Sequence, residues 1–68
     1  MGLKTFQLER DGKIEGETYA NPLQPCREWS KDEEHCKVAQ LFPDSSVRTY
    51  LSADECREIV LQTREYQN

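Results

Sequence analysis

Three cysteines and one histidine are the residues of this 68-residue chain best suited to chemistry: Cys26, His35, Cys36 and Cys56. Zinc accepts thiolate and imidazole ligands of this kind. The sequence has no Cys-x-x-Cys pair, so a metal site would have to be assembled from a loop and two helices. We therefore predict no cofactor, and a metal-binding or redox protein built on these four residues is the alternative hypothesis.

A cysteine nucleophile would need a base within hydrogen-bond reach. His35 directly precedes Cys36, and neighbouring side chains on a helix do not face each other. We therefore predict that the protein is not an enzyme, with His35 in solvent and Cys36 buried. Cys56 is expected to be a core thiol and Cys26 an accessible one. The sequence leaves open whether Cys26 and Cys36 are bonded to each other.

Acidic and aromatic side chains are the second group of candidates. The densest acidic run starts at Asp32, and the first turn of a helix favours carboxylates because its free amides attract them. A surface that imitates phosphates and engages a basic partner is the sharper interpretation. Exposed tyrosines near arginines are typical of binding hot spots. Tyr19 is expected on the polar face of the sheet and Tyr50 on the outer face of its strand. The predicted partner-binding residues are Glu15, Glu17, Tyr19, Glu28, Asp32, Glu33, Glu34 and Tyr50.

Charge and hydropathy limit the classes of protein. The net charge is -4, and the nine Lys and Arg residues are spread along the chain, which disfavours nucleic acid as a partner because such binding needs a basic surface. The longest apolar run is Ile59-Val60-Leu61, far short of the roughly 20 residues of a membrane span. The first residues do not resemble a secretory signal. With an odd number of cysteines, these features predict a cytoplasmic protein with reduced thiols and no membrane partner.

The first 20 residues predict a β-hairpin over residues 3–20. A two-residue turn of Asp11 and Gly12 would set Leu8 against Glu15 and Phe6 against Glu17. A three-residue loop that includes Arg10 would instead pair Leu8 with Ile14 and Phe6 with Gly16. We predict the three-residue loop, because it gathers the apolar side chains on one face.

The rest of the chain predicts one more strand and two helices. Two prolines indicate a connector over 21–29. Capping boxes at Ser30–Glu33 and Ser52–Glu55 predict helices over 30–42 and 52–66, with a third strand over 46–51. A right-handed crossover gives an antiparallel sheet of order 2-1-3 with both helices on one face. The predicted fold is a single α+β domain spanning 1–68.

These features together predict a non-catalytic protein-interaction module, such as a small inhibitor, adaptor or accessory subunit. It would bind a partner protein through the acidic helix or the outer face of the sheet. Small acidic chains of this form suit regulatory proteins of bacteria and their phages. The identity of the partner stays open, as does assembly into a homo-oligomer.

Overall fold

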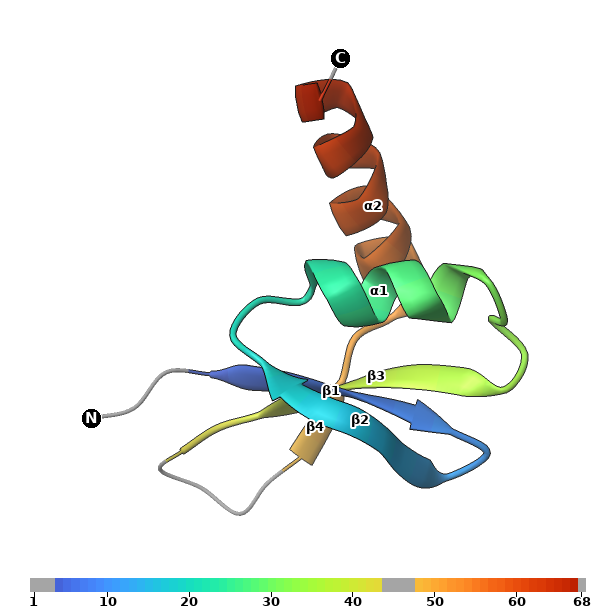
Figure 1. Cartoon of the computed structure of the whole chain (residues 1–68), viewed down its shortest axis with the longest axis vertical. Coiled ribbons are helices and arrows are strands. Elements are labelled where there is room, and N and C mark those ends of the chain that lie inside the picture. The colour runs from blue at the N-terminus through green and yellow to red at the C-terminus, as the bar shows by residue number, and fades with distance from the viewer. Residues whose placement is uncertain (1–3, 44–47, 68) are drawn as a thin grey trace.

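The computed structural model describes residues 4–43 and 48–67, with side chains through residue 63. It is an α+β fold with a four-stranded antiparallel sheet of order β2-β1-β3-β4, which confirms the predicted class. Both helices lie on the same side of the sheet, and α2 rises beyond α1 (Figure 1). The elements are β1 Thr5–Arg10, β2 Lys13–Tyr19, α1 Leu23–Ser30, β3 Cys36–Leu41, β4 Arg48–Tyr50 and α2 Ala53–Gln67.

The hairpin of β1 and β2 closes on a two-residue turn. Asp11 and Gly12 have φ angles of 53° and 79°, the left-handed pair that a type I′ turn requires. Leu8 therefore lies opposite Glu15, and Ile14 lies opposite Glu9. The predicted three-residue loop is wrong.

Two features remove the conflict that made this register look unfavourable. The register shifts between Phe6 and Leu8, around Gly16 with its φ of 81°, and places Tyr19 rather than Glu17 opposite Phe6. The carboxylate of Glu15 meets the guanidinium of Arg10 at 2.6 Å. An irregularity of this kind, a β-bulge, changes the direction of the side chains that follow it. The register shift and the ion pair both form only in the folded hairpin.

The predicted connector over 21–29 is mostly helical, because residues 23–29 belong to helix α1. The side chain of Asn21 accepts a hydrogen bond from the Leu23 amide at 3.2 Å. Pro25 is in the first turn, where the amide has no intrahelical acceptor, so a proline costs no hydrogen bond there. Ser30 is the last residue of α1, and its hydroxyl donates to the Arg27 carbonyl at 2.7 Å. The predicted capping box at Ser30 is therefore wrong.

The predicted helix over 30–42 is also wrong, because most of its second half is strand β3. This strand pairs antiparallel with β1 on one side and with β4 on the other. The predicted third strand is therefore a fourth one, β4, and positions 46 and 47 of that prediction lie outside the described residues. A strand does lie beside β1 on the side away from β2, as expected, but different residues form it.

The core lies between the sheet and the two helices. Its buried members are Phe6, Leu8, Cys26, Trp29, Cys36, Val38 and Cys56. Helix α2 follows the predicted capping box: the Ser52 amide donates to the Glu55 carboxylate at 2.8 Å, and the Glu55 amide donates to the Ser52 hydroxyl at 3.1 Å. Both helices of the described chain are too short or too polar to cross a bilayer.

Candidate functional site

The two faces of the sheet differ in what covers them. Successive side chains of a strand point to opposite faces, so Phe6 and Leu8 lie under the helices while Gln7 and Glu9 point away from them. Register then assigns residues of the other strands to the side without helices, which we call the outer face. The outer face contains Thr5, Gln7, Glu9, Ile14, Lys37, Ala39, Leu41, Arg48 and Tyr50.

A buried carboxylate lies at the centre of the outer face. Glu9 is only 6% exposed, although both described helices lie on the other side of the sheet. The Arg48 guanidinium donates to a Glu9 oxygen at 2.6 Å, and the Tyr50 hydroxyl donates to the same oxygen at 3.0 Å. A buried charge costs free energy unless it is paired and hydrogen-bonded, and both partners come from β4. The ion pair and the phenol hydrogen bond together stabilise the charge of Glu9 in its buried position.

Further contacts extend this arrangement across the sheet. The side chain of Gln7 accepts a hydrogen bond from Arg48 at 3.4 Å and donates one to Thr18 at 3.3 Å. The Lys37 ammonium lies 5.6 Å from the centre of the Tyr50 ring, within range of a cation–π attraction. Polar contacts thus connect β2, β1, β3 and β4, and hold the Tyr50 side chain at its hydroxyl and beside its ring.

Two apolar side chains remain open to solvent around this cluster. Ile14 is 50% exposed and lies on β2 opposite Glu9, whereas Tyr50 is 46% exposed and reaches Glu9 from β4. The sheet edges are poor templates for an added strand, because β4 has three residues and the pairing of β2 with β1 is irregular. The outer face therefore offers a surface for docking more readily than an edge for strand pairing.

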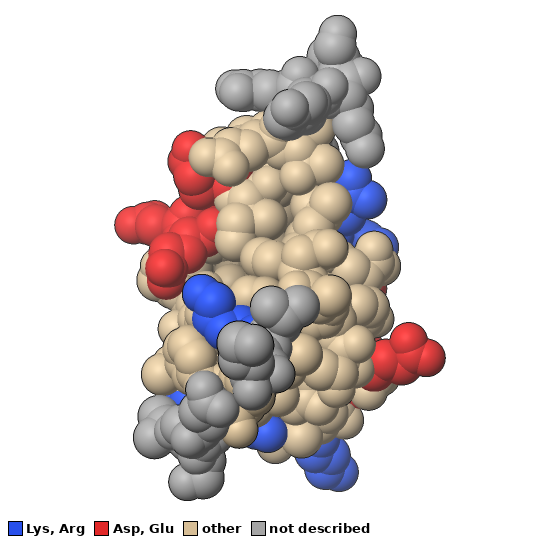
Figure 2. Space-filling model, turned by 90° about the vertical axis from the view of Figure 1, so that its left-hand side faces the viewer, with Lys and Arg blue, Asp and Glu red and all other residues tan. Residues whose placement is uncertain are grey.

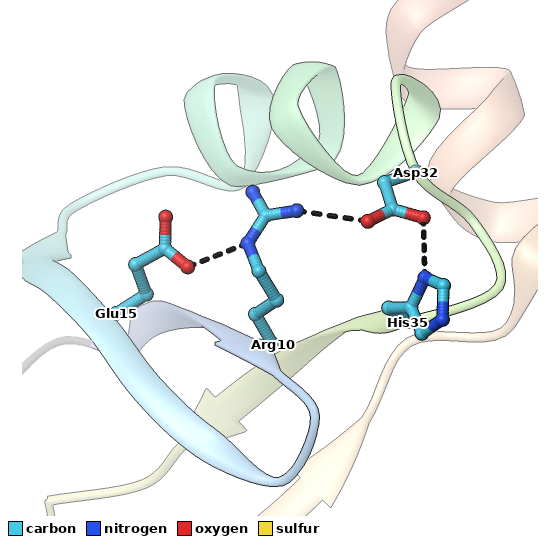
Figure 3. A network of polar contacts seen from close by, with 4 residues as sticks. All are labelled: Arg10, Glu15, Asp32 and His35. Atoms are coloured by element: carbon cyan, nitrogen blue, oxygen red, sulfur yellow. Dashed lines mark hydrogen bonds and ion pairs between the residues drawn. The ribbon is translucent and has the colours of Figure 1, made fainter.

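A second polar network joins the hairpin to the turn after α1. Figure 3 shows Arg10 between two carboxylates: its Nε meets Glu15 at 2.6 Å and its Nη1 meets Asp32 at 2.9 Å. The other Asp32 oxygen lies 2.9 Å from Nδ1 of His35. The backbone adds a further tie, because the Asp11 amide donates to the His35 carbonyl at 2.8 Å.

This Arg10 network shifts the titration of its members. The hydrogen bond between His35 and Asp32 raises the pKa of His35 and lowers the pKa of Asp32. The hydrogen bond to Glu15 raises the pKa of Arg10. These groups are a third to a half exposed, where ion pairs contribute little free energy. The network orients the turn between α1 and β3, and it gives Asp32 and His35 a structural role.

The predicted acidic surface is dispersed. Asp32, Glu33 and Glu34 lie in the turn between α1 and β3 rather than on a helix. Glu33 meets Arg57 at 2.8 Å, and Glu28 meets Lys31 at 3.3 Å. Asp32, Glu33 and Glu28 thus each form a salt bridge with a different basic residue. The prediction of an acidic helix is wrong.

The remaining predicted binding residues fall on different sides of the molecule. Glu17 is exposed on β2 and Glu34 is exposed in the turn. Tyr19 is half-buried opposite Phe6 on the helix-covered side, so its predicted place on the polar face is wrong. Tyr50 is on the outer face, as predicted. Glu9 and Arg48 were missed, because nothing in the sequence signals a contact between residues 39 apart.

All three cysteines are buried free thiols. Cys56 is 1% exposed, as predicted, but Cys26 is fully buried because helix α1 turns it into the core. The Cys26 and Cys56 sulfurs are 3.1 Å apart. His35 is paired with Asp32 instead of a thiol. Among the residues that the structure describes, no three His, Cys, Asp or Glu side chains gather as a metal site would require.

A groove of about 360 Å³ lies between the two helices. Arg57 is positioned 5.7 Å from the Trp29 ring centre and pairs with Glu33 at one side of the groove. Leu61 lines it and is 50% exposed. The groove is thus a second exposed surface, with the same degree of exposure at Leu61 as at Ile14.

Charge is distributed unevenly over the surface. On the face drawn in Figure 2, acidic side chains gather at one edge of the upper half, while basic side chains lie singly or in small groups around uncharged surface.

Compared with models of protein families, with curated proteins and with solved structures, the chain gives no match.

Proposed function

We propose that this chain is a non-catalytic interaction module that binds a partner protein through the outer face of its sheet. The observation that carries the proposal is the pair of half-exposed apolar side chains, Ile14 and Tyr50, on the face that neither α1 nor α2 covers. They flank Glu9, whose buried charge is already satisfied by Arg48. Binding there would bury apolar surface without desolvating an unpaired carboxylate.

Tyr50 has the properties of an anchor residue. Its hydroxyl is held by Glu9 and its ring lies beside Lys37. Fixing a side chain before binding reduces the conformational entropy that association costs. Interface hot spots are enriched in tyrosine. The contacts within the free protein therefore prepare Tyr50 for a partner.

The charges of the outer face indicate the chemistry of that partner. Lys37 and Arg48 contribute two positive charges, and Glu9 contributes one negative charge that Arg48 already pairs. A protein surface with an apolar patch bordered by carboxylates would be complementary. A nucleic acid would require a wider basic surface, and the basic groups visible in Figure 2 are dispersed.

Substitutions at two equally exposed positions test the proposal. Ile14→Thr keeps a β-branched residue on the strand, and Leu61→Gln keeps a good helix former on α2. Tagged wild-type protein, these two variants and Tyr50→Ala would be used for capture from the cells that contain the protein, after circular dichroism has verified their folding. We expect Ile14→Thr and Tyr50→Ala to reduce recovery of the same partner at least ~10-fold, a difference of roughly 1.4 kcal/mol in binding.

Leu61→Gln should leave recovery unchanged. Loss of the partner with Leu61→Gln and its retention with Ile14→Thr would move the binding site to the helical groove and contradict the proposal. Sedimentation of the purified chain tests whether the outer face binds a second copy of the same chain. A dimer that Ile14→Thr dissociates would show that the partner is this second copy and not another protein.

A further inference from the structure

Two nucleophilic side chains lie close together in the core, between the helices. Cys26 on α1 and Cys56 on α2 are 0% and 1% exposed, and their sulfurs are 3.1 Å apart. The remaining cysteine, Cys36, is on β3 and is also buried. The fold has thus brought together two thiols that are 30 residues apart in sequence.

We propose that Cys26 and Cys56 are a reversible disulfide site that cross-links α1 to α2 when the protein meets a small-molecule disulfide. The thiolate of one cysteine attacks the oxidant, R–S–S–R, and releases one R–S⁻. The second thiolate then attacks the mixed disulfide and releases the other R–S⁻. Each protein thiol loses its proton, and these two protons end on the two R–SH products. The protein gains one S–S bond and the oxidant loses one.

The contact between the two thiols favours this pairing over any other. The hydrogen bond to Cys26 lowers the pKa of Cys56, while the same hydrogen bond and burial raise the pKa of Cys26. Cys56 is therefore the better first nucleophile, since the thiolate is the reactive form. Burial is the largest of the causes that raise the pKa of Cys36. Cys36 is expected to stay a free thiol.

An oxidant can reach the buried pair if α2 separates briefly from α1. Among the side chains of α2 that the structure describes, Cys56, Ile59 and Val60 contact the core, and the helix extends past α1 (Figure 1). Helices with few core contacts open more readily than central strands. Opening controls the rate of oxidation, whereas the distance between the sulfurs in the folded state controls the equilibrium.

Equilibration in buffers of reduced and oxidised glutathione tests the site. The native chain and the chain in 8 M urea would be quenched with acid, alkylated and digested with trypsin. Cleavage at Arg27, Lys37 and Arg48 places the three cysteines in separate peptides, so mass spectrometry identifies the bond directly. We expect the Cys26–Cys56 bond to form with an equilibrium constant roughly 100-fold higher in the native chain than in urea.

Linkage requires that oxidation then reduces the equilibrium constant for unfolding by the same factor. The urea midpoint of the oxidised protein should rise, in the wild type and in Cys36→Ala. Cys26→Ala should abolish the effect. A native chain that is oxidised no more readily than the unfolded chain would overturn the proposal, as would a bond to Cys36 or a lower midpoint after oxidation. These readouts on the wild-type chain hold even where a cysteine variant fails to fold.

Discussion

The two faces of the sheet use neighbouring residues of the same strands for different purposes. On the helix-covered side, Leu8 and Val38 lie opposite each other and are 4% and 0% exposed. On the outer face, Glu9 and Lys37 are the next pair along the same two strands. The first pair excludes water by apolar packing, whereas Glu9 is shielded by polar side chains from β4.

This difference shows which side chains the fold requires. Removing apolar contacts from the covered side opens a cavity in a core that is small in a chain of this length. The outer face needs its central ion pair, but about half of the Ile14 and Tyr50 side chains stays exposed to solvent in the folded protein. This exposed apolar surface is available for a partner.

The largest expected effect is at the core. Leu8→Ala should lower the free energy of unfolding by about 2–5 kcal/mol, because it removes a buried side chain and leaves a cavity. Ile14→Ala, on the neighbouring strand and half-exposed, should cost less than about 1 kcal/mol. Urea unfolding followed by circular dichroism measures both. Similar losses would mean that the two faces contribute equally to stability.

Next in size is the loss of the buried carboxylate. Glu9→Ala leaves the Arg48 guanidinium and the Tyr50 hydroxyl without this acceptor, which should cost about 1–3 kcal/mol. Glu17→Ala is the control, because this carboxylate is exposed on β2, and its removal should change stability by less than about 0.5 kcal/mol. The same unfolding experiment would refute the role of Glu9 if the two variants were equally stable.

The helix caps predict a smaller difference. Ser52→Ala removes a hydroxyl that accepts from the Glu55 amide, and should cost about 1 kcal/mol. Ser30 is at the end of α1 and accepts no such hydrogen bond there, so Ser30→Ala should cost less. Thermal unfolding of the two variants measures the difference. A larger loss at Ser30 would contradict the boundaries of both helices.

The smallest expected effect is a pH dependence of the Arg10 network. The raised pKa of His35 means that protonation favours the folded state: this contribution is complete below about pH 6.5, the ordinary value for the group, and is lost as the pH rises through the raised value. The lowered pKa of Asp32 gives a contribution present above pH 3.8 and lost as the pH falls through its lower value.

Urea midpoints between pH 5 and 9, compared with those of His35→Gln, isolate the histidine contribution. The wild type should lose stability relative to the variant as the pH rises through the neutral range. A constant difference, or a gain with rising pH, would show that Asp32 and His35 are not paired in solution.

Local signals account for what the sequence predicted correctly. The capping box of Ser52 and Glu55 lies within four residues, and both of its hydrogen bonds form. The strands of the hairpin were found because their residues alternate. The α+β class followed from these elements, although the third strand was placed too late in the chain.

The errors come from interactions that a local pattern cannot contain. Pro25 suggested a connector, but a proline in the first helical turn is harmless when the face around Cys26 and Trp29 is buried. The segment from Cys36 became a strand because β1 and β4 pair with it on both sides. The two-residue turn of Asp11 and Gly12 was not predicted, because the register shift near Gly16 that relieves its unfavourable pairs could not be foreseen.

The candidate site was only partly predictable for the same reason. Tyr50 was found because its type and its strand position suffice to indicate an exposed aromatic. Arg48 and Glu9 became neighbours through the pairing of β4 with β3 and of β3 with β1. The contact between Cys26 and Cys56 similarly depends on two helices packing on the same side of the sheet.

The most direct test of the outer face as the binding surface is site-specific photo-crosslinking. A photoreactive side chain at position 14 reports on the outer face, and one at position 61, equally exposed in the native chain, reports on the helical groove. Both proteins would be irradiated in the cells that contain the chain, and the adducts identified by mass spectrometry. We predict one dominant protein adduct from position 14 and none of that adduct from position 61. The same adduct from position 61, with none from position 14, would contradict the account.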